Sequence, residues 1–248
     1  MPSDAPVMDF PVMPFMEEVN DFAAIGLSDG VAYRLGYGDW NSSAAPVTFP
    51  DFPGREHVNP VNAFCKAGNN IFVATPEKIY KYECGSSGFD PDLMNSLTAK
   101  TAYSLPGVTR MTCTDDGLSV YAQTEGGKIY MQYANTQFTE VTGLGTGSKC
   151  LLKADRKVLV LEWNSTSSKI YIERSDTHSL SCIASGKFEK SIDDYADAQV
   201  CYGVINNYSA DEKCYLFLKL KKGPDIDTEV EVEVYAVEND TFEKVCEF

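Results

Sequence analysis

The chain has 248 residues, and its 36 acidic against 21 basic side chains give a net charge of −15. Such a chain is poorly suited to the phosphate backbone of nucleic acids, which clustered Lys and Arg recognise. Its 44% hydrophobic content is that of a globular protein, and no stretch approaches the ~18 apolar residues of a membrane helix. We therefore expect no nucleic-acid partner and no membrane span.

The first 19 residues differ from the rest of the sequence. "PVMDFPVMPFMEE" (6–18) mixes Met, Phe and Val with Pro and lacks the basic start of a secretory signal. We expect an extended segment that packs on the chain's own sheets or docks on a partner, with Phe10, Met13 and Phe15 as contacts. Eight cysteines without dense clustering favour thiols and an intracellular protein, cytoplasmic or nuclear.

A repeating unit follows from residue 20 onward. "NAFCKAGNNIFVATPEKIYKYEC" (62–84) is similar to "RMTCTDDGLSVYAQTEGGKIYMQY" (110–133) and to "SKCLLKADRKVLVLEWNSTSSKIYIER" (148–174). Each copy has a short strand with Cys, a turn, an apolar strand, a second turn and a strand that begins near Lys-Ile-Tyr. One cysteine position recurs, at Cys65, Cys113, Cys150 and Cys201 in a looser copy. "DFAAIGLSDGVAYRLGYGDW" (21–40) is a divergent first copy.

The turns indicate hairpins rather than helices. Asp115-Asp116-Gly117 and Glu125-Gly126-Gly127 are typical of tight turns between alternating apolar runs. An outer fourth strand is expected after most units, in 45–52, 101–108, 137–144, 179–185 and 241–248. The single helix-like stretch is "DPDLMNSLTAK" (90–100).

Five such units fit the length, at about 20–60, 61–108, 109–147, 148–196 and 197–248. Four-stranded units at this period resemble β-propeller repeat proteins as a class. The resemblance implies an all-β fold with five four-stranded blades in a single domain, 20–248, after the 1–19 segment. A two-sheet sandwich is the alternative. The Trp-Asp marks of WD repeats and the near-identical repeats of five-bladed lectins are both missing, so no family's functional residues are transferred.

Each candidate motif for a cofactor or a metal lacks a feature that such a site needs. "GLGTGSK" (143–149) resembles a phosphate loop, but a strand pattern follows it, which favours a connector. "DIDTEVEVE" (225–233) lacks the Gly and Glu of a calcium loop, and His57 and His178 are solitary. The sequence predicts no cofactor and no metal site.

The sequence therefore predicts a non-catalytic scaffold or adaptor in a protein assembly, and not an enzyme. A glycan-binding protein that stacks Trp40 or Trp163 on sugars is the alternative. Glycoside hydrolysis stays open because two carboxylates suffice for it, but turn and surface roles explain the acids at hand, and no catalytic residue is assigned. These acids are Asp39, Asp90, Asp115, Asp193 and Asp194.

Two predictions are specific to the last two units. Residues 149–190 carry eight basic against five acidic side chains, so we expect a docking surface for an acidic segment of a protein partner. Its members are Lys149, Lys153, Arg156, Lys157 and Lys169. In the last unit, alternation in 214–236 predicts a hairpin whose paired residue numbers sum to 450, with Lys219 opposite Glu231 and Leu218 opposite Val232.

Overall fold

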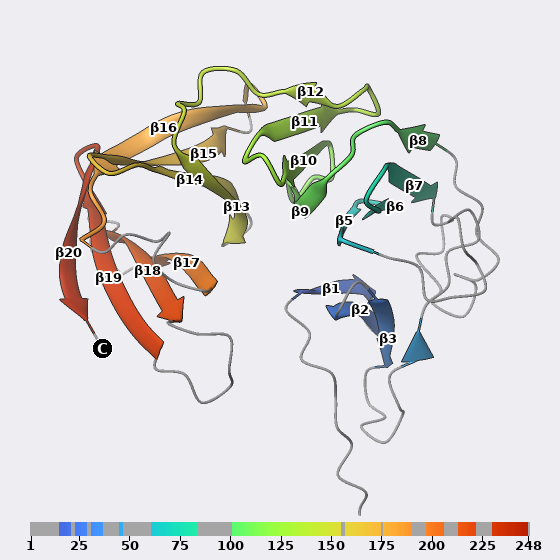
Figure 1. The fold of residues 1–248 in the computed structure, drawn as a ribbon, viewed down its shortest axis with the longest axis horizontal. Helices are drawn as coiled ribbons and strands as arrows, with labels where there is room; N and C mark the ends of the chain where they lie inside the picture. Colours follow the sequence, from blue (N-terminus) through green and yellow to red (C-terminus); the bar gives the residue numbers. More distant parts are fainter. Residues whose placement is uncertain are drawn as a thin grey trace, which may run out of the picture. The chain divides into compact units, whose positions relative to one another are not determined.

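The computed structural model describes 15–20, 23–28, 31–36, 45–46, 61–83, 101–154, 157–174, 176–189, 197–205, 213–221 and 230–247. Twenty strands and their connections account for all of these residues, which confirms the all-β prediction (Figure 1). Within these ranges no helix has the length and apolar character needed to span a membrane. The helix-like stretch 90–100 lies outside the described residues.

The chain divides into two compact units, and each is treated by itself. The first comprises residues 1–126 and 132–138, and the second comprises 127–131 and 139–248. The first unit contains two complete four-stranded sheets in the orders β1-β2-β3-β4 and β5-β6-β7-β8. The strands of the first sheet are β1 (Phe15–Asn20), β2 (Ala23–Ser28), β3 (Val31–Gly36) and β4 (Ala45–Pro46). Those of the second are β5 (Ala63–Ala67), β6 (Asn70–Ala74), β7 (Ile79–Glu83) and β8 (Thr101–Tyr103).

A third four-stranded sheet has the order β12-β11-β10-β9, and the unit boundary runs through it. Its strands are β9 (Val108–Cys113), β10 (Ser119–Thr124), β11 (Ile129–Tyr133) and β12 (Thr139–Glu140). Within the first unit, the β9–β10 turn lies against the β5–β6 turn. The Cys113 thiol donates a hydrogen bond to the Lys66 carbonyl over 2.8 Å, and a Cβ on Gly117 would collide with the backbone of Gly68.

The second unit contains an eight-stranded sheet with the order β13-β14-β15-β16-β20-β19-β18-β17. Each half is an antiparallel run of four strands, and a short parallel pairing of Ser185 with Thr241 and Gly186 with Phe242 joins them. The first half is β13 (Ser148–Ala154), β14 (Lys157–Trp163), β15 (Ser168–Arg174) and β16 (Ser179–Gly186). The second half is β17 (Asp197–Ile205), β18 (Lys213–Lys221), β19 (Val230–Glu238) and β20 (Thr241–Glu247).

A strand is present in each of the five segments predicted as outer strands, as β4, β8, β12, β16 and β20. Only β4, β8 and β12 lie at a sheet edge, because β16 and β20 pair with each other in the eight-stranded sheet. The first strand of the first sheet, β1, begins at Phe15 and so lies in the segment for which the sequence predicts an extended strap. The predicted domain boundary at residue 20 falls at the end of this strand.

The repeated positions have distinct packing roles. In the Lys-Ile-Tyr copies the isoleucines are the fully buried members, with Ile79, Ile129 and Ile170 at most 1% exposed. Tyr80 and Tyr130 are half-buried, and Tyr171 is buried. Five cysteines are thiols rather than disulfides, as the sequence predicts; these are Cys65, Cys113, Cys150, Cys182 and Cys246.

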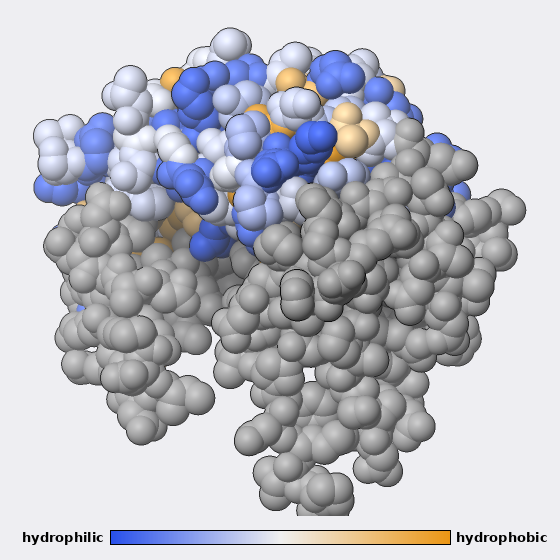
Figure 2. Space-filling model, turned by 45° about the vertical axis from the view of Figure 1, so that its right-hand side comes forward, coloured by the Kyte–Doolittle hydropathy of each residue, from blue (hydrophilic) through white to orange (hydrophobic). Residues whose placement is uncertain are grey.

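The core of the second unit joins the two halves of its sheet. Leu159, Leu161 and Ile170 of the first half form one buried cluster with Leu216 and Leu218 of the second. Three aromatic rings complete this cluster, with centroid distances of 5.2 to 5.7 Å among Phe188, Tyr235 and Phe242. On the visible face the described surface is mostly hydrophilic (Figure 2), in keeping with a core that holds the large apolar side chains.

The predicted register of the β18–β19 hairpin is wrong by one residue. Lys219 pairs with Val232, and Leu218 pairs with Glu233, so the paired numbers sum to 451. The bulky Tyr235, which is fully buried opposite Leu216, sets the inward face of β19. Glu233 lies on the same face and is buried as well, so it needs polar partners.

Those partners are present. The Tyr235 hydroxyl donates to Glu233 Oε2 over 2.7 Å, and Lys244 Nζ lies 3.1 Å from Glu233 Oε1. Lys244 also contacts the carboxylates of Glu189 and Glu247, each at 2.7 Å. Because the hydrogen bonds to Glu189, Glu247 and Glu233 favour the charged amine, they raise the pKa of Lys244 above its usual value.

Candidate active site

The end of β15 and the turn before β16 bring a glutamate and a histidine together. The sequence of the turn, Arg-Ser-Asp-Thr-His-Ser (174–179), is rich in residues that favour turns. The N–H groups of Thr177 and His178 donate to the Arg174 carbonyl over 3.2 and 2.7 Å, which closes the turn. His178 has a φ of 47°, in the left-handed region that non-glycine residues seldom adopt.

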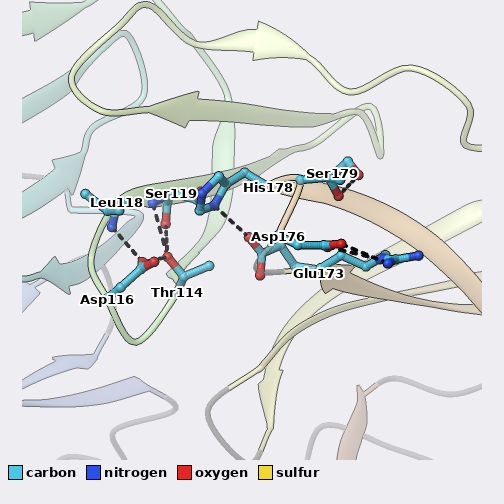
Figure 3. Close-up of polar contacts among 10 residues, drawn as sticks. Thr114, Asp116, Leu118, Ser119, Glu173, Asp176, His178 and Ser179 are labelled. Atoms are coloured by element: carbon cyan, nitrogen blue, oxygen red, sulfur yellow. Dashed lines mark hydrogen bonds and ion pairs between the residues drawn. The ribbon is translucent and has the colours of Figure 1, made fainter.

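This backbone conformation places the His178 imidazole against the carboxylate of Glu173, the penultimate residue of β15 (Figure 3). Nδ1 lies 3.4 Å from Glu173 Oε1. The Glu173 side chain is only 6% exposed, whereas the His178 side chain is 22% exposed. A buried carboxylate therefore lies beside one nitrogen of a ring that reaches solvent.

Two further polar contacts belong to the same turn. Arg174 donates two hydrogen bonds to Asp176, from Nε over 3.1 Å and from Nη2 over 2.9 Å. The hydroxyl oxygens of Thr177 and Ser179, on either side of His178 in the sequence, lie 2.8 Å apart. The turn thus combines an imidazole, a guanidinium group and two hydroxyl groups.

The β9–β10 turn in Figure 3 serves as a structural contrast. Asp116 Oδ1 accepts hydrogen bonds from the Thr114 hydroxyl and the Leu118 N–H, and the Thr114 hydroxyl accepts one from the Ser119 N–H. These contacts satisfy turn backbone groups. Because these contacts already account for Asp116 and Thr114, we assign this turn no chemical role.

The structure explains "GLGTGSK" as a connector between β12 and β13, as the sequence predicts. The N–H groups of Gly145 and Gly147 donate to the Glu162 carboxylate over 2.8 and 3.2 Å. The Tyr171 hydroxyl donates to the same carboxylate over 3.0 Å. The loop amides therefore hold an anion, but it is the protein's own Glu162, which is 5% exposed.

The five predicted docking residues do not share one face. Lys149 and Lys169 pair in register with Glu162 from either side, and Lys149 donates to the Gly147 carbonyl over 2.8 Å. Lys153 is exposed on the same face of β13, because side chains alternate along a strand. By the same alternation, Lys157 lies on the other face. Arg156 lies outside the described residues.

The structure describes only some of the remaining predicted residues. Phe10 and Met13 fall outside the described residues, and the side chain of Phe15 is not described. Binding of a partner at any of these positions stays a prediction. Asp115 lies exposed in the β9–β10 turn, and Trp163 packs against the core of the second unit. The other acids considered for glycoside hydrolysis, and Trp40, lie outside the described ranges.

Sequence reasoning missed the Glu173–His178 pair because it treated His178 as solitary. A glutamate near the end of a predicted strand, followed by a histidine five residues later, was the available signal. No group of three or more His, Cys, Asp or Glu side chains suited to a metal occurs in the described part of the chain.

The fold has counterparts among solved structures, although no family model and no curated protein matches the sequence. A "putative 6-phosphogluconolactonase" from Bacteroides uniformis is 14% identical with a TM-score of 0.55, over 95% of this chain and 73% of that one. Kluyveromyces lactis Hsv2 is 10% identical with a TM-score of 0.55, over 96% of this chain and 74% of that one.

At these identities the likeness concerns the fold alone. It nevertheless corrects the functional prediction from the sequence. That prediction of a non-catalytic scaffold, with a glycan-binding protein as its alternative, argued from the fold and from missing motifs. The argument is wrong, because the chain shares its fold with the Bacteroides uniformis protein, whose description is that of a hydrolase.

Proposed function

We propose that the chain has a propeller-like fold in which β1–β4, β5–β8, β9–β12, β13–β16 and β17–β20 are five blades. The four-strand order repeats in every group, and the fold likeness to Hsv2 supports this arrangement. Small-angle X-ray scattering tests it. A compact propeller of this length has a radius of gyration of about 18 Å. A scattering profile of two separated bodies contradicts it.

We propose that the protein is a hydrolase that opens a lactone, with His178 as general base. The observation that carries this is the position of the buried Glu173 carboxylate, 3.4 Å from Nδ1 of the half-buried His178. This distance is slightly longer than a hydrogen bond, as catalytic contacts in unliganded enzymes often are. The lactone substrate class follows the description of the Bacteroides uniformis protein that shares the fold.

The pair would work as follows. Glu173 accepts the Nδ1–H of the neutral imidazole, so Nε2 takes a proton from water while the water oxygen attacks the lactone carbonyl carbon. Glu173 stabilises the imidazolium that forms. The ring C–O bond then breaks, and the proton passes from Nε2 to the leaving alkoxide, which yields a hydroxy acid. Every atom comes from water or the lactone, and no cofactor is needed.

The experiment follows acid release from 6-phosphogluconolactone, with the spontaneous hydrolysis subtracted. Wild type should accelerate hydrolysis, and His178→Asn should lower kcat/KM by a factor of about 10² to 10⁴, the usual contribution of a general base. Thermal unfolding of the variant serves as the control, because a folding defect would also lower the activity. Wild type without activity, or a variant with the activity of wild type, contradicts the proposal.

A further inference from the structure

Among the described strands, β16 has one edge that is largely unpaired. It pairs with β15 along one side, but on the other side it meets β20 only at Ser185 and Gly186. Figure 1 shows the two strands running apart from this junction. Residues 179–184 thus have no neighbouring strand on that side in the described part of the chain. Such an edge presents N–H and C=O groups that a further strand can bond.

This edge lacks the protection that the other segments predicted as outer strands have. β4 and β12 are 2 residues long and β8 is 3, and short edges discourage pairing between molecules. β20 has 7 residues but carries Glu243, Lys244 and Glu247. β16 has 8 residues, Ser-Leu-Ser-Cys-Ile-Ala-Ser-Gly, with neither a charge nor a proline. Among these five strands, β16 alone combines length with a lack of charge.

The sequence of the edge suits a second copy of the same chain. Two antiparallel copies of one strand are related by a two-fold axis, so each edge faces the same residues of its partner. Because β16 is uncharged, no like charges oppose each other in any register. The pairing with β15 skips Ile183, so residues 179–182 form the regular part of the edge.

The charges beyond the two ends favour the antiparallel arrangement. The nearest Asp, Glu, Lys or Arg residues in the sequence are Asp176 before the edge and Lys187 after it, and both are exposed. In an antiparallel pair the start of one edge meets the end of the other, so Asp176 approaches Lys187 of the second copy, twice by symmetry. A parallel pair would bring each charge near its own kind. Opposite charges across an interface speed association and fix its register.

We propose that two copies of this chain associate through antiparallel pairing of residues 179–184, which joins the eight-stranded sheets of the two copies edge to edge. A single short edge gives an interface at the small end of the usual range, so the dimer dissociates on dilution. The backbone of β16 and the charges at its ends carry this association. It is independent of the proposed hydrolase activity.

Sedimentation equilibrium of the whole chain tests the proposal, in reducing buffer so that no disulfide forms between copies of the exposed Cys182. The average mass of wild type should rise with concentration toward that of a dimer. Ser181→Lys puts a charge on both facing edges and should raise the Kd of the dimer by about tenfold or more. Ser181→Gln adds a long side chain without charge and should change the Kd by less than about threefold.

Val245→Lys is the matched control, because it adds the same charge to β20 at a position that is 53% exposed. It should leave the Kd unchanged. An equal effect of Ser181→Lys and Val245→Lys would show that net charge, and not this edge, governs association. A wild type that is monomeric at all concentrations overturns the proposal and leaves the edge to a strand of another protein. Unfolding curves exclude misfolding as the cause of a loss.

A charge exchange tests the orientation of the two copies. Asp176→Lys and Lys187→Asp should each weaken the dimer, because each variant brings like charges together at both ends of the paired edges. The variant that combines the two changes restores opposite charges and should recover the Kd of wild type. A combined variant that associates no better than the single variants contradicts the antiparallel arrangement.

Discussion

Glu233 and Lys244 face each other across the β19–β20 hairpin, with 3.1 Å between Oε1 and Nζ, and the Glu233 side chain is fully buried. A buried carboxylate that loses its cation is strongly destabilising. Lys244→Met should therefore lower the Tm of the protein by several degrees in differential scanning fluorimetry. Lys128→Met is the control, because its ion pair with Glu140 is exposed at both ends and should contribute almost nothing. Equal melting temperatures for the two variants would show that Glu233 does not depend on Lys244.

The loop before β13 should tolerate no side chain at Gly145. An added Cβ would collide with the Glu162 carboxylate, which holds the loop amides. We expect Gly145→Ala to lower the free energy of unfolding by about 1–3 kcal/mol, the usual range for overpacking. A Cβ on Gly126 would meet no atom within 4 Å, so Gly126→Ala should change the free energy of unfolding by less than about 0.5 kcal/mol. Urea titration of both variants measures the difference, and similar values would contradict the collision.

Alanine substitutions at Gly68 and Gly117 distinguish backbone strain from a packing collision. Gly68 and Gly117 both have positive φ, at 59° and 68°, so an alanine is strained at either position by about 1 kcal/mol. A Cβ on Gly68 meets nothing within 4 Å, whereas a Cβ on Gly117 collides with the Gly68 backbone. Gly117→Ala should thus be the more destabilising variant in urea titration. The reverse order would show that the two turns do not pack as described.

Tyr171 should give stability that is lost at high pH. Burial first, and then the hydrogen bond to Glu162, raise the pKa of Tyr171 from 10.0 to about 12. The unfolded chain loses the proton first, so the contribution is complete below pH 10 and declines between pH 10 and pH 12. The difference in unfolding free energy between wild type and Tyr171→Phe should shrink over this interval. A difference independent of pH would contradict the raised pKa.

Glu162→Gln separates the two causes. It removes the charge that accepts the Tyr171 hydrogen bond, and burial, the larger cause, remains. A difference titration of phenolate absorbance against the Tyr171→Phe background should therefore show a lower midpoint that still exceeds 10.0. A midpoint that returns fully to this value would make the hydrogen bond the dominant cause.

The strands were predictable because their signals are local. The recurring Cys position, the Gly turns and the five outer segments all correspond to strands and turns of the structure, and alternation with tight turns is the information that a hairpin needs. The register of β18 and β19 was not predictable, because the alternation of Val and Glu in 229–234 fits two registers. The decisive residue is Tyr235, whose burial against Leu216 outweighs the cost of placing Glu233 inside.

The candidate site was predictable only in part. Glu173 and His178 are close in sequence, but whether they meet depends on the left-handed φ of His178 and on the burial of Glu173, neither of which has a sequence signature. The basic docking surface was inferred from charge counts alone. Strand alternation then separates Lys157 from Lys149 and Lys169, and Glu162 lies between the latter two.

The most direct test of the central claim is a double-mutant cycle on lactone hydrolysis with Glu173→Gln, His178→Asn and the two combined. Residues that act as one unit show strongly non-additive losses of kcat/KM. We predict that each single variant loses activity and that the combined variant loses no more than His178→Asn alone. If the losses of the two single variants multiply in the combined variant, or if Glu173→Gln keeps the activity of wild type, then Glu173 and His178 do not form a catalytic pair.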